Sequence, residues 1–195
     1  GKLVWSQTAY AFLDQDAPDT ANPSLWRDTQ LNHIYGLFEV TDGIYQVRGY
    51  DMSNVTFIKG DTGWIVVDPL MSVECAQAAL ALVEENLGTF PVKAVIYSHS
   101  HVDHFGGVRG IISEEDVQSG DVQVIAPEGF EKHAVSENIY AGTAMGRRAS
   151  YQYGTMLEGG ETGSLAIGIG MGQSKGKTSY ISPTLEITQT GEKHT

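Results

Sequence analysis

Four residues within six positions carry side chains that can hold metal ions: His99, His101, Asp103 and His104. Side chains two positions apart in an extended segment share a face, so His99 and His101 can bind one ion together. If the chain then turns, the adjacent Asp103 and His104 can reach a second ion a few ångströms away. Because three of the chain's six histidines fall in this stretch, the spacing predicts a two-metal site.

The types of these side chains indicate which metal the site prefers and what it is for. Imidazole and carboxylate without thiolate suit borderline divalent ions, zinc first, with manganese or iron as alternatives. A structural zinc site is usually closed by four ligands that include cysteine, whereas a cluster of His and Asp on a loop leaves room for a water. Cys75 is the only cysteine, so the chain cannot form an internal disulfide or a thiolate cluster. We therefore predict a catalytic zinc centre, with Asp103 as a catalytic residue, and a buried thiol at Cys75.

The elements that must position this cluster read as strands that alternate with helices. Apolar runs between turn residues predict strands at 44–47, 55–58, 64–67, 92–97 and 122–126. One helix is expected from Ser72 to about Leu87, where Gly88 ends it, and two more from about Gly107 and from Pro127. This order predicts an α/β fold. The cluster follows the strand at 92–97 directly, and ligand sites of such sheets lie at the carboxyl ends of strands.

Composition divides the chain into three parts. Residues 1–40 alternate polar turns with large apolar residues and read as an extended arm. Residues 41–153 contain the predicted strands, the first helices and the cluster. Residues 154–195 open with a glycine-rich loop to about residue 178.

The charge balance excludes some classes of partner. The chain has 24 Asp and Glu residues against 12 Lys and Arg, which gives a formal net charge of -12. Such a surface repels phosphate backbones and anionic membranes, so nucleic acid is not an expected partner. No apolar run of about 20 residues is present, so no membrane span is expected. The acidic surface otherwise indicates good solvation.

The pattern His99-x-His101-x-Asp103-His104 after an apolar strand resembles the signature motif of the metallo-β-lactamase superfamily. The resemblance implies an αββα sandwich, of which this chain supplies mainly the N-terminal half. It implies that residues 41–153 are the first half of the catalytic domain and that residues 154–195 contain the start of the second half. It also implies that His99 and His101 bind one zinc ion and that Asp103 and His104 bind the other. Asp68 matches the acidic residue that braces the metal-binding loop through hydrogen bonds. A turn residue at the end of a strand is the alternative for Asp68.

Further stretches look like the zinc-dependent alkylsulfatases, the detergent-degrading branch of that superfamily, as in linear primary-alkylsulfatases. They cover residues 36–40, 45–51, 61–64, 97–101 and 140–148. The resemblance implies two Zn²⁺ ions and hydrolysis of a linear alkyl sulfate, such as dodecyl sulfate, to an alcohol and inorganic sulfate by a metal-bound water. It also implies a homodimer in the full-length enzyme and a periplasmic or secreted location.

Two arginines and three tyrosines are candidates for contacting the substrate. Arg147 and Arg148 can pair with sulfate, because a guanidinium matches a tetrahedral oxyanion. Tyr140 can line an alkyl channel, together with Tyr151 and Tyr153. Surface arginines and ordinary aromatic packing are the alternatives. For the whole enzyme the alternatives are a hydrolase of a lactone, thioester or β-lactam, or an inactive metal-binding piece.

A complete two-metal site needs further ligands that this chain hardly offers. After His104 the only histidines are His133, in a helix-like stretch, and His194, next to the last residue. Both are expected at the surface rather than at the metal. The family carries two acidic ligands and a histidine in its second half, so we expect the 195 residues to be part of a longer enzyme.

Overall fold

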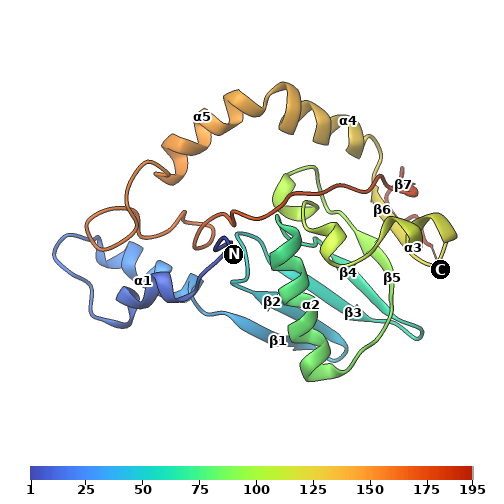
Figure 1. The fold of residues 1–195 in the computed structure, drawn as a ribbon, viewed down its shortest axis with the longest axis horizontal. Coiled ribbons are helices and arrows are strands. Elements are labelled where there is room, and N and C mark those ends of the chain that lie inside the picture. The colour runs from blue at the N-terminus through green and yellow to red at the C-terminus, as the bar shows by residue number, and fades with distance from the viewer. Residues whose placement is uncertain (195) are drawn as a thin grey trace.

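The computed structural model describes residues 1–194, which contain one seven-stranded mixed sheet (Figure 1). The strands lie side by side in chain order: β1 Gly36–Thr41, β2 Ile44–Arg48, β3 Val55–Lys59, β4 Trp64–Val67, β5 Val92–Ile96, β6 Gln123–Pro127 and β7 Leu185–Ile187. Neighbours from β1 to β4 pair antiparallel, and those from β4 to β7 pair parallel. The predicted α/β class is confirmed.

Helix α2, Val73–Leu87, makes the crossover between the parallel strands β4 and β5. Its buried residues recur at helical spacing, which presents one apolar face to the sheet: Cys75, Ala76, Ala79 and Val83. Gly88 ends the helix at a φ of 85°, as the sequence predicted. Cys75 is the buried thiol that we expected, and burial raises its pKa to about 11, so this thiol stays protonated.

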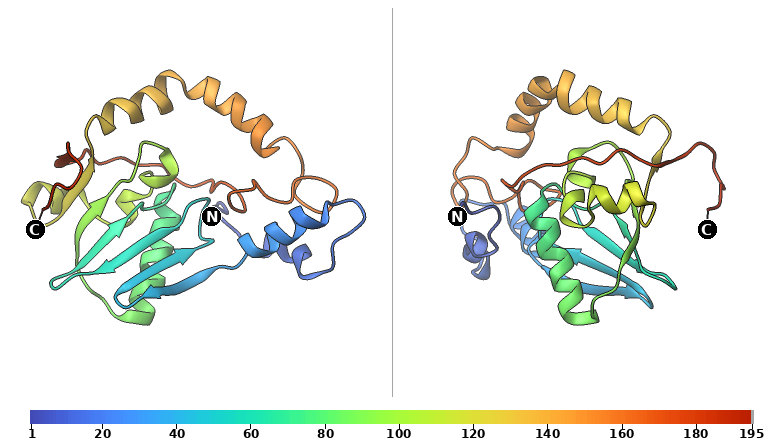
Figure 2. Two further views of the ribbon diagram at one scale, coloured as in Figure 1. Left: turned by 180° about the vertical axis from the view of Figure 1, so that it is seen from behind. Right: turned by 45° about the vertical axis from the view of Figure 1, so that its right-hand side comes forward.

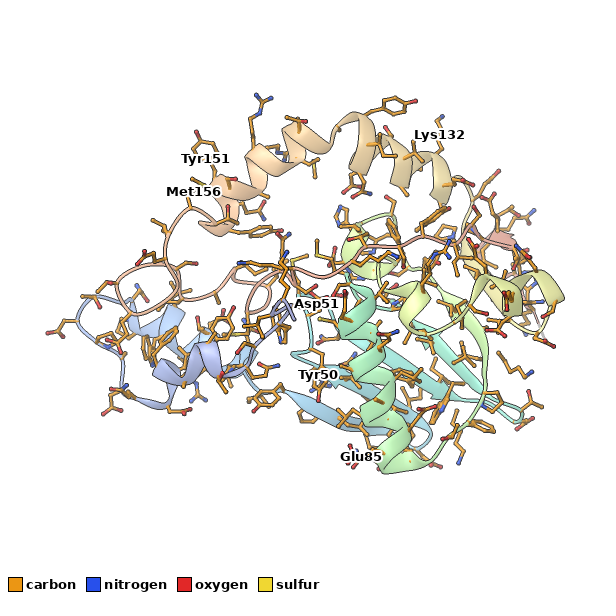
Figure 3. All side chains as sticks on the ribbon, viewed as in Figure 1. Tyr50, Asp51, Glu85, Lys132, Tyr151 and Met156 are labelled. Atoms are coloured by element: carbon orange, nitrogen blue, oxygen red, sulfur yellow. The ribbon has the colours of Figure 1, made fainter. Side chains whose placement is uncertain are left out.

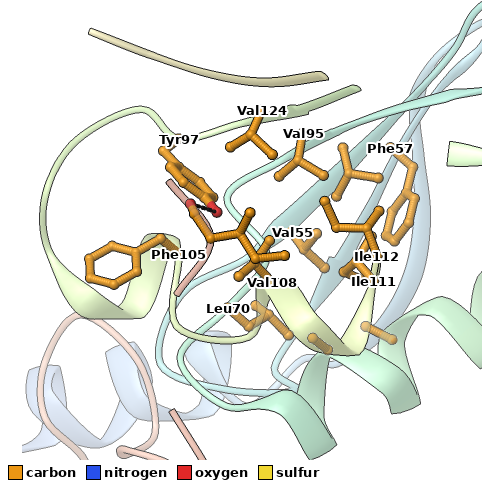
Figure 4. Packing of buried hydrophobic residues seen from close by; sticks show 14 of the residues in the cluster. Val55, Phe57, Leu70, Val95, Tyr97, Phe105, Val108, Ile111, Ile112 and Val124 are labelled. Atoms are coloured by element: carbon orange, nitrogen blue, oxygen red, sulfur yellow. Dashed lines mark hydrogen bonds between the residues drawn. The ribbon is translucent and has the colours of Figure 1, made fainter. Parts of the chain in front are cut away.

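Large side chains fill the core between the sheet and α2 (Figure 4). Trp64 is 2% exposed, and its ring meets those of Tyr45, Phe57 and Phe90 edge-on, with centroids 5.8 to 6.1 Å apart. Tyr97, directly after β5, is fully buried and donates its hydroxyl to the carbonyl of Ile181 at 3.1 Å. The end of the strand that leads into the His and Asp cluster is therefore fixed by packing and by a hydrogen bond.

The N-terminal residues differ from the predicted extended arm. Thr8–Asp14 form a 3-10 helix, Pro23–Asn32 form helix α1, and β1 starts within the region assigned to the arm. Local signals explain α1, because the Asn22 side chain accepts hydrogen bonds from two backbone N–H groups and a proline follows it. The prediction of extended structure was wrong here. The domain boundaries at residues 40 and 153 stay predictions.

The predicted helix from Gly107 is also wrong. A short 3-10 helix, Val108–Gly110, takes its place, preceded by another at Val102–His104, and α3, Glu114–Ser119, starts only after Ser113. Ser113 and Asp116 form a capping box that fixes this start. The chain before it is held close to the β4–α2 turn, since the N–H of Gly107 donates to the carbonyl of Leu70 at 2.9 Å.

A curved row of helices, which we call the helical arch, follows β6 and stands off from the sheet in each view (Figures 1 and 2). It consists of α4 Phe130–Val135, a π-helical turn Ser136–Tyr140 and α5 Gly142–Tyr153. Helix α4 begins three residues later than the sequence predicted. No residue of α5 is buried among the residues described.

The glycine-rich residues 154–178 form no helix or strand, as the composition predicted. This segment returns along the body of the molecule and is fastened to it by Asp51, which is 2% exposed and labelled in Figure 3. The Asp51 carboxylate accepts hydrogen bonds from the Ser174 hydroxyl at 2.7 Å and from the Ser174 N–H at 3.1 Å. It also accepts from the N–H of Ser72 at 3.3 Å, so one buried carboxylate joins this return segment to the start of α2.

Candidate active site

The residues predicted to bind metal lie at one edge of the sheet, where β4 and β5 end. These strands run parallel with Val67 opposite Ile96, so the residues that follow them emerge side by side. Asp68 follows β4, and residues 98–107, which we call the metal loop, follow β5 after Tyr97. The N–H of Asp68 donates to the carbonyl of Ile96 at 2.9 Å and joins the two strand ends.

Within the metal loop the four side chains face one another in two pairs. His99 Nε2 lies 3.1 Å from His101 Nδ1, and His104 Nε2 lies 3.1 Å from Asp103 Oδ2. The pairs are adjacent, since the rings of His99 and His104 are 4.1 Å apart between centroids. No three His, Cys, Asp or Glu side chains of the described residues are arranged around one common metal position. The four residues come together as predicted in space, and their binding of metal stays a prediction.

The remaining nitrogens of two of these histidines are held by a shared network around Asp68. Ser98 Oγ donates to Asp68 Oδ2 at 2.7 Å, so it can only accept from His99 Nδ1, which lies 2.9 Å away. His104 Nδ1 donates to Asp68 Oδ2 at 2.9 Å. In its neutral form, which metal binding requires, each ring therefore carries its hydrogen on the outer nitrogen, and its inner nitrogen presents a lone pair to the facing partner.

This arrangement has the chemistry of a cation site. A nitrogen lone pair that faces another lone pair or a carboxylate is repelled unless a positive charge lies between the two groups. Imidazole together with carboxylate is also a donor set that suits zinc. Burial alone would lower the pKa of His104, but hydrogen bonds to Asp103 and Asp68 raise it to about 9. Burial would raise the pKa of Asp103, yet its bond to His104 lowers it. Protonated His104 thus supplies positive charge in the metal-free protein, and the residues present fit a divalent metal ion.

The backbone of the metal loop is anchored to three other segments. The Ser53 hydroxyl donates to the carbonyl of Asp103. The carbonyl of Gly106 accepts from both the N–H and the hydroxyl of Ser179, at 2.7 and 2.8 Å. A Cβ on Gly106 or Gly107 would lie 2.3 or 2.1 Å from a backbone oxygen of the β4–α2 turn. Only glycine allows this close approach.

A cavity of about 370 Å³ opens beside Asp103 and His104. It is lined by Gln46, Met52, Ser53, Asn54, Thr56, Val67, Asp68, Asp103, His104 and Ile169. Polar side chains and a few apolar ones meet in this space next to the metal loop. A small molecule that enters it reaches Asp103 and His104.

Residues 48–176 match the family model described as "Metallo-beta-lactamase superfamily". This match spans more than half of the chain and includes the whole metal loop. The chain belongs to the metallo-β-lactamase superfamily. The fold of this superfamily implies metal binding, commonly of zinc, which agrees with the donor set described above.

Among superfamily members with curated descriptions, the chain is 54% identical over its whole length to a linear primary-alkylsulfatase from Pseudomonas sp.. It is 50% identical over its whole length to an (R)-specific secondary-alkylsulfatase from Pseudomonas sp.. It spans 29% and 30% of the lengths of these relatives. The solved structure of a stereoselective inverting sec-alkylsulfatase from Pseudomonas sp. superposes with a TM-score of 0.94 at 50% identity, over all of this chain and 31% of that one. The resemblance to alkylsulfatases is thus confirmed.

The candidate substrate residues lie on the helical arch rather than in the cavity. Tyr140 ends the π-helical turn and is 85% exposed, and Arg147 and Arg148 are exposed on α5. Among the described residues, no hydrogen bond joins these three side chains to the metal loop. Tyr151 is also exposed and is labelled on α5 in Figure 3. Their roles in substrate binding stay predictions.

The structure places one acidic side chain at the metal loop that the superfamily motif did not indicate. Glu137, in the π-helical turn, lies with Oε1 3.2 Å from His101 Nε2. It is 36 positions from His101 in sequence, so neither spacing nor periodicity could identify it. The two later histidines lie elsewhere, with His133 exposed on α4 and His194 2.9 Å from Glu192.

We expect Asp68→Asn to lower the zinc affinity of the full-length protein by about 10- to 100-fold, the usual effect of losing a residue that orients metal ligands. Asp68 accepts from the N–H and hydroxyl of Ser98 as well as from His104, and an amide nitrogen cannot accept any of them. Asn tolerates the φ of 56° at this position, so the backbone is preserved. Competition titration with a zinc chelator measures the effect.

The matched control for this experiment is Asp42→Asn, which changes the same charge in an exposed hairpin turn. It should bind zinc as the wild type does. Equal affinities of Asp68→Asn and Asp42→Asn would show that Asp68 does not orient the metal ligands.

Proposed function

We propose that the protein is a zinc-dependent hydrolase that cleaves linear alkyl sulfate esters, such as dodecyl sulfate, to an alcohol and inorganic sulfate. The observation that carries the proposal is the pair of facing donor sets in the metal loop. His99 and His101 would hold one ion, and Asp103 and His104 the other. The identity of 54% with a linear primary-alkylsulfatase, over every part of the chain, supports this choice of substrate.

The cavities beside the metal loop suit an ester with a polar head and an apolar tail. The cavity at Asp103 and His104 shares Met52, Asn54 and Ile169 with a second one of about 110 Å³. The second cavity has a mixed lining, with the apolar side chains Leu31, Ile34 and Met171 beside the polar side chains Asn32, Arg48 and Asp51. An alkyl chain that extends from a sulfate group at the loop would meet these apolar side chains, and burial of its surface is favourable in proportion to the area.

When bound, the two ions would supply positive charge that polarises the ester and lowers the pKa of a water. The chain's own residues hold the geometry in which this happens. Asp68 fixes the proton on His104 Nδ1 and, through Ser98, the proton on His99 Nδ1, so the inner nitrogens stay available as ligands. Asp103, which is 7% exposed, holds a negative charge at the cavity wall.

A substrate panel with the full-length protein tests the proposal. Sulfate release from dodecyl sulfate should be fast, should stop after zinc is removed with a chelator and should return when zinc is added. A secondary alkyl sulfate of similar length distinguishes the two substrate types named for the relatives. A lactone, a thioester and a β-lactam test the other superfamily chemistries. Absence of sulfate release from every alkyl sulfate by a zinc-loaded protein would reject the proposal.

The predictions of a homodimer and of a periplasmic or secreted location rest on the family resemblance alone. No helix among the described residues is both long and apolar enough to cross a membrane. A homodimer in the full-length enzyme and a periplasmic or secreted location stay predictions. An inactive metal-binding piece is the alternative that the chelation experiment separates from a catalyst, because it would bind zinc without releasing sulfate.

A further inference from the structure

The helical arch contacts the metal loop through one ion-pair contact and two hydrogen bonds, all made by the π-helical turn. Glu137 Oε1 lies 3.2 Å from His101 Nε2, and Glu137 Oε2 accepts from the Ser100 hydroxyl at 3.4 Å. Asn138 Nδ2 donates to the carbonyl of Ser100 at 3.3 Å. Both oxygens of the Glu137 carboxylate therefore contact the segment that carries His99 and His101.

His101 offers two nitrogens, and their neighbours differ. Nδ1 faces His99 Nε2 at 3.1 Å, whereas Nε2 points to Glu137. A carboxylate only accepts hydrogen bonds, so the Glu137 carboxylate beside Nε2 favours the tautomer of neutral His101 that carries its hydrogen on Nε2 and its lone pair on Nδ1. The lone pair then lies on the atom that faces the first predicted metal position.

The same arrangement recurs at the second predicted metal position. Asp68 accepts from His104 Nδ1 and leaves His104 Nε2 toward Asp103. Each predicted metal pair thus contains one histidine whose outer nitrogen meets a carboxylate. The two carboxylates come from opposite parts of the fold, since Asp68 follows β4 and Glu137 belongs to the arch.

The local backbone explains how Glu137 reaches the loop. The turn Ser136–Tyr140 is π-helical, and the N–H of Ala141 donates to the carbonyl of Ser136 at 2.9 Å, five residues back. A π-helical turn adds a residue to a helix, shifts the direction of the side chains that follow and is frequent at functional sites. The Glu137 side chain is 24% exposed, although most of the arch is solvent-facing.

We propose that Glu137 is a positioning residue that orients His101 for metal binding and ties the helical arch to the metal loop. This inference rests on the proposed zinc function. Glu137 acts through His101 and is not assigned as a ligand. The arch, which also carries Tyr140, Arg147 and Arg148, is thereby linked to the His101 ring through a single carboxylate.

The test compares Glu137→Ala, Glu137→Gln and the control Glu128→Gln in the full-length protein. Glu128 is exposed before α4, and the control removes the same charge. Zinc affinity is measured by competition with a chelator, and the absorption spectrum of the cobalt-loaded protein reports ligand geometry. We expect about a 10- to 100-fold loss of affinity for Glu137→Ala. Glu137→Gln should lose less, because its amide oxygen still accepts from Nε2, and Glu128→Gln should match the wild type.

Each outcome decides the question. A zinc affinity and a cobalt spectrum of Glu137→Ala that equal those of Glu128→Gln would overturn the proposal. If Glu137→Ala does not fold, Glu137→Gln decides: a several-fold weaker affinity at an unchanged melting temperature of the metal-free protein supports it, and an unchanged affinity rejects it. A protein that binds zinc tightly but hydrolyses no alkyl sulfate would reject the proposed substrate and leave the role of Glu137 intact. A protein that binds no divalent metal would reject both.

Discussion

Asp103→Ala or His101→Ala in the full-length protein should reduce the hydrolysis of dodecyl sulfate by at least about 100-fold. A metal that stabilises charge in a transition state contributes several kcal/mol, and each 1.4 kcal/mol or so is tenfold in rate. Asp103 is 7% exposed and pairs with His104, and His101 faces His99, so each substitution removes half of one donor pair. Sulfate release under saturating zinc measures the effect.

The matched control for His101→Ala is His133→Ala, which removes an exposed histidine on α4. It should keep the wild-type rate. Zinc content measured alongside the rate separates a lost metal from a misplaced one, and the melting temperature shows whether the variant folds. Turnover near the wild-type rate in Asp103→Ala would contradict the assignment of this residue to the metal and to catalysis.

Gly107→Ala should destabilise the protein by at least about 3 kcal/mol, the upper part of the range for overpacked cores. The new Cβ would lie 2.1 Å from the carbonyl oxygen of Pro69 and 2.7 Å from that of Ser72. Backbone atoms cannot move aside as a flexible side chain can. The φ of -87° at Gly107 suits any residue, so the whole effect is steric. The shift breaks the contact between the metal loop and the β4–α2 turn, and zinc affinity should fall with stability.

Gly146→Ala is the control for this substitution, because a Cβ there meets nothing within 4 Å inside helix α5. It should stabilise the helix by up to about 1 kcal/mol, since alanine is the better helix former. Thermal unfolding followed by circular dichroism compares the two variants. A Gly107→Ala protein that melts together with the wild type would show that the turn and the loop are less closely packed than described.

Residue types and their spacing predicted the central unit of the fold and the metal loop. Alternation and apolar runs located the strands from β2 to β6, and Gly88 located the end of α2. These signals are local, because the spacing of apolar residues within one strand or helix determines which of its faces is buried. The parallel pairing of β4 and β5 then places Asp68 beside the metal loop, as the order strand, helix, strand implies.

Two of the elements predicted from the sequence differ from the structure, and the physical reasons are different. The cap at Asn22 and the proline after it mark helix α1, yet the many polar turn residues around them suggested an extended arm. After Gly107 the chain stays close to the β4–α2 turn, and a helix begins only at the capping box of Ser113. The signal for helix α1 was present in the sequence. The path of the chain after Gly107 depended instead on the backbone against which the glycines pack.

By itself the sequence determined the superfamily, the α/β order and the four side chains of the metal loop, because a short motif and periodic burial are properties of neighbouring residues. Only the tertiary structure decided which groups hold those side chains. Glu137 reaches His101 across 36 positions, and Asp51 joins Ser72 to Ser174 across more than a hundred. Contacts between such distant residues depend on how the whole chain packs, and no spacing along the sequence encodes them.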